Sequence, residues 1–127
     1  MELKVMHSSD LKFNLDTWKR ELKFHFDEMD TFQEKLDELT ARQELEITAL
    51  KKLDILQNRI LIEKESISKL KHRCRNVFTN FNRAVYEDNF NDSLMNERNE
   101  LRNDMRKYIQ LHYLLKEEIL DFILENS

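Results

Sequence analysis

The sequence predicts an all-α fold, an up-down-up antiparallel three-helix bundle of long coiled-coil-like helices. The 127 residues contain no glycine and no proline, whereas an average composition would include roughly fifteen of them. Glycine supplies the positive φ of tight turns and proline interrupts helices, so this chain has few means of turning. Apolar residues also recur at alternating spacings of three and four, the a and d positions of a heptad. The length indicates one domain, residues 1–127.

The first predicted helix covers about residues 8–39. Ser8, Ser9 and Asp10 are candidate N-caps, and residues 1–7 before them are expected to be frayed or loosely packed. The heptad rows of this segment form one apolar seam, made by Leu11, Leu15, Trp18, Leu22, Met29, Phe32, Leu36 and Leu39.

The second predicted helix covers about residues 41–85. The heptad phase slips by three residues between Leu36 and Leu53, which indicates either a stammer in a continuous helix through residues 36–46 or a turn. Thr40 and Gln43 have the spacing of a capping box, which favours a turn near Thr40. The second seam consists of Ala49, Leu53, Leu56, Ile60, Ile67, Leu70, Cys74, Val77, Phe81 and Ala84.

The third predicted helix covers about residues 92–126. Asn89 precedes it, and asparagine tolerates the left-handed conformation better than most residues. Asn91 or Asp92 can cap the helix that follows. Connections this short force neighbouring helices to run antiparallel. The third seam consists of Leu94, Leu101, Met105, Tyr108, Leu115, Ile119 and Phe122.

The composition argues against several classes of function. The 21 basic and 25 acidic residues give a net charge of −4, which implies no general affinity for nucleic acid. The single cysteine, Cys74, allows no internal disulfide and fits a reducing cytoplasm. No apolar run approaches the ~20 residues of a membrane span, and the first residues lack the order of a signal peptide. Without glycine no phosphate-binding loop can form, so we expect a cytoplasmic, non-enzymatic protein without a cofactor.

Polar residues interrupt each seam near its middle, at His25, Glu63 and His112. Counted from turns near residues 42 and 89, their heights differ by about 5 Å, so all three can share one layer. Two imidazoles and a carboxylate can ligate a transition metal. They can equally form a hydrogen-bonded polar layer that fixes helix register, and an error in the assigned seam is a third alternative. We favour the polar layer, because di-metal bundles carry Glu-x-x-His motifs and residues 25–28 have the reverse order.

A basic stretch between residues 66 and 84 contains no acid and lies near Phe78 and Phe81. Such a stretch could bind phosphate backbones. Two of its members occupy e and g positions, however, where acids of a neighbouring helix usually meet them. Nucleic-acid binding is therefore an alternative rather than the leading expectation. Its candidate residues are Lys69, Lys71, Arg73, Arg75 and Arg83.

Apolar residues outside the seams gather in the half of the bundle nearest the first turn. From Tyr108 to Leu124 the third helix is apolar on nearly every side, as expected of a helix buried all round. Three helices cannot bury so much surface, whereas a C2 homodimer or a helical protein partner could. Scattered exposed apolar residues are the alternative. The candidate interface residues are Phe24, Phe26, Ile55, Leu61, Ile62, Leu111, Leu114 and Ile123.

Three stretches carry a family resemblance: Trp18 to Phe24 with Glu28 and Phe32, Leu56 to Asn58 with Ile67 and Leu70 to His72, and Leu115 to Glu118 with Phe122. They resemble a group of small, uncharacterised all-helical bacterial proteins. The resemblance implies a three-helix fold and a bacterial, cytoplasmic setting, and it brings no activity and no catalytic residue. The leading hypothesis is thus a self-associating interaction or structural module. A metal-binding bundle and a nucleic-acid accessory protein are the alternatives.

Overall fold

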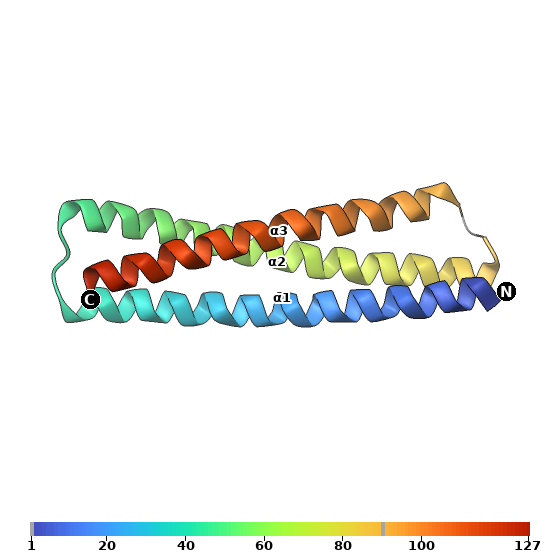
Figure 1. The fold of residues 1–127 in the computed structure, drawn as a ribbon, viewed down its shortest axis with the longest axis horizontal. Coiled ribbons are helices and arrows are strands. Elements are labelled where there is room, and N and C mark those ends of the chain that lie inside the picture. The colour runs from blue at the N-terminus through green and yellow to red at the C-terminus, as the bar shows by residue number, and fades with distance from the viewer. Residues whose placement is uncertain (1, 90) are drawn as a thin grey trace.

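The computed structural model describes residues 2–89 and 91–127, with side chains from residue 9 onward. It contains three long helices, α1 (Glu2–Arg42), α2 (Ile47–Glu87) and α3 (Asp92–Asn126). They lie side by side in an elongated bundle in which α2 runs antiparallel to the other two (Figure 1). The predicted up-down-up three-helix bundle is confirmed.

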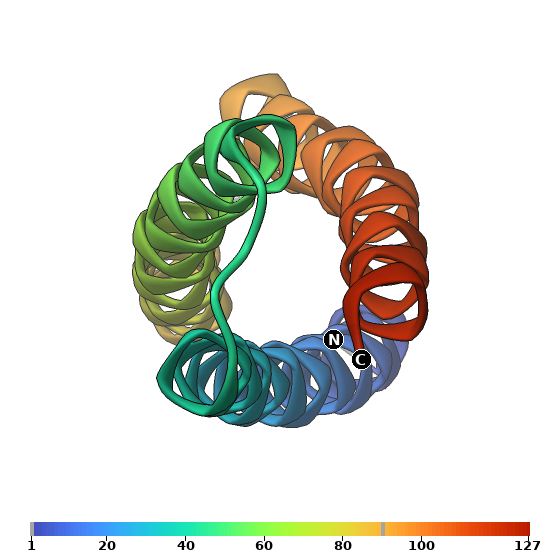
Figure 2. The same ribbon diagram turned by 90° about the vertical axis from the view of Figure 1, so that its left-hand side faces the viewer.

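The three helices surround a common axis, and the connection between α1 and α2 passes across one end of the bundle (Figure 2). The seams predicted from the heptads face this axis. Most seam residues are buried, and Trp18, Phe32, Ala49 and Leu94 are half-buried. Because the apolar rows follow each helix for most of its length, the core is a long column.

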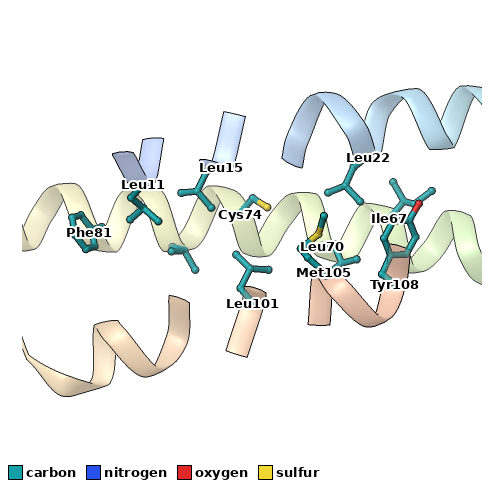
Figure 3. Close-up of a cluster of buried hydrophobic side chains, with 11 residues drawn as sticks. Leu11, Leu15, Leu22, Ile67, Leu70, Cys74, Phe81, Leu101, Met105 and Tyr108 are labelled. Carbon is teal, nitrogen blue, oxygen red and sulfur yellow. The ribbon is translucent and has the colours of Figure 1, made fainter. Parts of the chain in front are cut away.

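Two apolar clusters make up this core. One surrounds Leu15, Cys74 and Leu101, and Tyr108 lies at one end of it with its hydroxyl directed toward α1 (Figure 3). The other surrounds Met29, Leu56 and Ile119. The interruption between them falls at the height of the polar seam residues, so the polar residues separate two apolar halves.

The first connection is a turn, but it lies later than the capping-box pattern predicted. α1 continues to Arg42 rather than ending near residue 39, and α2 begins at Ile47 rather than near residue 41. The Thr40 hydroxyl donates to the Leu36 carbonyl within the helix, at 3.2 Å, instead of capping a new one. The Gln43 side chain donates to the carbonyl of Asn126. This contact ties the connection to the end of α3, which the local sequence could not reveal.

The second connection uses the polar residues expected there. Asn91 caps α3, because its side-chain oxygen accepts a hydrogen bond from the Leu94 backbone N–H at 3.0 Å. Among the described residues of this connection, the one in the left-handed conformation is Asp88, with φ of 52°, rather than an asparagine. The Asn89 backbone N–H donates to the Ala84 carbonyl at 2.9 Å and so closes the end of α2.

The N-terminal segment is helical from Glu2, so α1 begins earlier than predicted. We also expected loose packing of residues 1–7, but their side chains lie outside the part of the chain that the structure describes, so this stays a prediction. Within the described part of the chain, none of the helices combines the length and the apolar character needed to cross a bilayer.

Candidate functional site: a polar layer in the core

His25, Glu63 and His112 meet between the two apolar clusters. Their exposed fractions are 2%, 8% and 0%, so all three side chains are withdrawn from water. The two imidazole rings stack face to face, with centroids 3.6 Å apart and planes inclined by 7°. One side chain from each helix therefore lies at one height, where the spacing argument had placed them.

His112 is held through both of its ring nitrogens. Its Nδ1 lies 2.8 Å from Glu63 Oε1, and its Nε2 lies 3.3 Å from Glu28 Oε1. An ionised carboxylate can only accept, so both contacts are hydrogen bonds when His112 is an imidazolium that donates from each nitrogen. These partners assign the positive charge to His112.

Glu28 and Lys116 complete the layer, and the seam pattern did not identify them. Lys116 Nζ donates to Glu28 Oε2 at 2.6 Å, so both oxygens of Glu28 have a partner. Burial by itself raises the pKa of the Glu28 carboxyl, but the hydrogen bonds from Lys116 and His112 outweigh it and hold that pKa below its usual value. Glu28 follows His25 by three residues and Lys116 follows His112 by four, spacings that place them on the same helix faces.

His25 is the neutral member of the stack. Its Nδ1 lies 2.8 Å from the Tyr108 hydroxyl. Burial, reinforced by the charges of nearby carboxylates, raises the pKa of Tyr108, so this hydroxyl keeps its proton and donates it to His25. Burial and the adjacent charge of His112 lower the pKa of His25 from 6.5 to about 4. A neutral ring consequently stacks on a cationic one.

Glu63 is the incompletely satisfied member of the layer. Its Oε1 accepts from His112, whereas its buried Oε2 has no hydrogen-bond partner among the described residues. A carboxylate offers about four lone-pair positions, and buried polar atoms normally find partners. The formal charges of the layer balance, because the carboxylates of Glu28 and Glu63 face the cations of His112 and Lys116. One oxygen, Glu63 Oε2, still lacks a hydrogen-bond donor among the described residues.

A group that could hold a metal ion is present, with Glu28 in place of the expected Glu63. Ligand atoms of His25, Glu28 and His112 all lie within 4.8 Å of one another. Both histidines have an outer partner at Nδ1, and His112 donates from this atom to a carboxylate, as metal-ligating histidines usually do. The two rings are nearly parallel, however, so their Nε2 atoms do not point toward one common position, and Lys116 already neutralises Glu28. The present geometry is that of a hydrogen-bonded layer.

The candidate interface residues divide over several faces. Phe26 and Ile123 are half-buried and pack against the core clusters. Leu61 is exposed and lines a shallow hollow with Phe26 and Lys64, whose ammonium lies over the Phe26 ring. The remaining exposed candidates are Phe24 on α1, Ile55 and Ile62 on α2, and Leu111 and Leu114 on α3.

The basic residues considered for nucleic-acid binding differ in exposure and in their partners. Arg73 forms an ion pair with Asp104 of α3 at 2.7 Å, and Lys71 is half-buried. Their heptad positions, g and e, lie on opposite sides of the α2 seam. The other three, Lys69, Arg75 and Arg83, are exposed.

No family model, no curated protein and no solved structure matches this chain. The resemblance to small bacterial helical proteins stays a prediction.

Proposed function

We propose that the protein is a non-enzymatic interaction module that associates with a second copy of itself in a bacterial cytoplasm. The observation that carries this proposal is an apolar surface over the contact between α2 and α3. We call it the α2–α3 face and define it by Ile55, Ile62, Leu111 and Leu114. Their exposed fractions are 53%, 54%, 63% and 56%, which are high for aliphatic side chains so close together.

Contacts between the helices support the grouping of these residues into one face. Arg59 of α2 forms an ion pair with Glu118 of α3, which brings these sides of the two helices together. Ile62 and Leu111 line one hollow in the same region. Ile55 lies one heptad before Ile62, and Leu114 lies one helical turn after Leu111. The face therefore follows the groove between α2 and α3.

The size of the surface and its charges favour a second copy as the occupant. The chain exposes 8811 Å², whereas a compact monomer of this mass exposes about 7,250 Å². The excess is about twice the ~800 Å² that each partner contributes to a standard interface, so one chain exposes enough surface to form one. Arg59 and Glu118 supply both signs of charge beside the apolar residues. A two-fold axis can pair each sign reciprocally with the other copy.

The test is the mass of the protein in solution, measured by light scattering after size-exclusion chromatography. We expect a dimer mass at micromolar concentration and a monomer mass for Leu114→Lys, since a charge placed in an apolar interface leaves it unpaired. Phe13→Lys is the matched control, because Phe13 is 68% exposed on α1, away from this face. A monomer mass for the unchanged protein, or a dimer that survives Leu114→Lys, would refute the proposal.

A metal-binding bundle is the second candidate, favoured by the cluster of His25, Glu28 and His112. A divalent transition metal would displace Lys116 from Glu28 and require one imidazole to turn out of the stack. Titration with Co²⁺ tests this by absorption, because ligand-field bands report nitrogen and oxygen ligation. His112→Gln should abolish the bands, and His72→Gln, which alters an exposed histidine of α2, should not. Bands that persist in His112→Gln would exclude this cluster as the site.

A further inference from the structure

A hollow of about 180 Å³ opens between α2 and α3 beside the polar layer. Its apolar wall is formed by Ile62, Leu111 and Leu115, and its polar wall by Glu63, Ser66 and Tyr108. A cavity of about 150 Å³ accepts a molecule the size of benzene. The hollow therefore has room for a ligand of about five or six non-hydrogen atoms.

Glu63, a residue of the polar wall, carries the open carboxylate oxygen described above. Glu63 is 8% exposed, and its Oε2 is buried without a hydrogen-bond partner in the described part of the chain. Glu28, the other carboxylate of the layer, has a partner on each oxygen. Leaving a buried charged acceptor unpaired is costly, so an atom that donates to Glu63 is the missing element of this site.

We propose that this hollow binds a short primary alkylammonium ion, with the ammonium on Glu63 and the alkyl chain against Ile62, Leu111 and Leu115. An ammonium has three N–H donors and no acceptor. The oxygen atoms of Glu63 and Ser66, two residues of this wall, can accept them. A ligand that can only accept, such as a carboxylate, would bring a like charge to Glu63.

Arg59 also lines the hollow, but its charge does not oppose a cation there. Its guanidinium is paired with Glu118, whose carboxylate also lies 3.4 Å from Lys52 Nζ. The hydrogen bond from Arg59 lowers the pKa of Glu118, so this carboxylate stays ionised beside it. Of the residues that line the hollow, Glu63 is the one with a buried oxygen that lacks a hydrogen-bond partner.

The site does not depend on self-association, although Ile62 and Leu111 belong both to the hollow and to the α2–α3 face. Leu114 belongs to the face and does not line the hollow, whereas Glu63 lines the hollow and is buried beneath the face. Leu114→Lys and Glu63→Gln therefore separate the two proposals.

Titration of the full chain with n-butylammonium in phosphate buffer, free of competing amines, tests the proposal by calorimetry. We expect 1-butanol, a neutral molecule of equal chain length, to bind at least tenfold more weakly, because a hydrogen bond to a charged group is worth about 1.5–3 kcal/mol. Glu63→Gln should weaken butylammonium binding by a similar factor, and Leu114→Lys should leave it unchanged.

A further variant covers the case in which Glu63→Gln fails to fold, as judged by circular dichroism. Ile62→Trp fills the hollow from its exposed rim, since Ile62 is 54% exposed, and it leaves the polar layer intact. It should abolish butylammonium binding. Equal affinity for butanol and butylammonium, undiminished binding in Glu63→Gln or in Ile62→Trp, or no binding to the unchanged protein would overturn the proposal.

Discussion

Acid should destabilise this bundle through His25. The ring is buried at 2% exposure, stacks on the cationic ring of His112 and accepts a hydrogen bond from Tyr108. All three surroundings favour the neutral imidazole. The unfolded chain exposes the same ring to water, where it binds a proton near pH 6.5. The unfolded state therefore binds more protons than the folded state below that pH, and stability falls as pH falls.

The size of the effect follows from the two pKa values, 6.5 for the ordinary ring and about 4 for His25 in the folded protein. Integrating the proton linkage gives a loss of about 2 kcal/mol between pH 7 and pH 5, and about 3 kcal/mol by pH 4. This stabilisation is fully present above pH 6.5 and is lost as pH falls through the window down to about 4. Domains of this size are stable by only 5–15 kcal/mol, so the loss is a large fraction.

Urea unfolding followed by circular dichroism at pH 7, 6, 5 and 4 measures this loss. His25→Gln is the informative variant, because glutamine can accept from Tyr108 and does not titrate. We expect the unchanged protein to lose about 2 kcal/mol more than His25→Gln between pH 7 and pH 5. His72→Gln, at an exposed position, controls for loss of a histidine and should behave like the unchanged protein. Parallel pH profiles for the unchanged protein and His25→Gln would refute the reasoning.

Three further predictions concern the scaffold. Burial raises the pKa of the Cys74 thiol to about 11. A disulfide reagent at pH 8 should therefore modify this thiol only as urea unfolds the protein. Rapid modification of the folded chain would contradict this prediction. Asn91→Ala should lower the free energy of unfolding, measured with urea, by about 1 kcal/mol, because the Asn91 side chain accepts a hydrogen bond from the Leu94 N–H at the start of α3. An unchanged urea midpoint would show that this cap is dispensable. Leu101→Ala should lower the free energy of unfolding by about 2–5 kcal/mol, since Leu101 is 0% exposed in the core. A loss under 1 kcal/mol would mean that the surrounding side chains close the cavity around the smaller residue.

The fold was predictable from the sequence because the heptad rows are almost uninterrupted. Nearly every seam residue inferred from spacing faces the core, and the absence of glycine and proline leaves two connections. The turn after α1 was misplaced for a physical reason. Thr40 can cap a new helix or donate back to the Leu36 carbonyl, and both fit the local pattern. In the structure Thr40 donates to Leu36, and Gln43 in the connection that follows contacts Asn126, which is far away in sequence.

The site was predictable only in part. His25, Glu63 and His112 were visible because each breaks an apolar row. Glu28 and Lys116 were not, because they lie beside the seam at positions where charged residues are ordinary. The i, i+3 and i, i+4 spacings to the two histidines were the available signal. Spacing could not show the ring stack or the open oxygen of Glu63, since both depend on side-chain rotamers.

The polar layer gives the bundle a register that its apolar seams cannot give. Met105 and Ile119 lie one heptad on either side of His112, and both are fully buried apolar residues like their neighbours. A one-heptad slip of α3 would exchange one apolar side chain for another at most core positions. At Glu63, however, it would replace the imidazolium of His112 with Met105 or Ile119 and leave a buried carboxylate without a donor. That penalty is on the order of 1–3 kcal/mol or more for a charged group, so it selects against the slipped arrangement. Glu63 also lines the hollow between α2 and α3, and its Oε2 has no hydrogen-bond partner among the described residues, so register and the proposed ligand site share one residue.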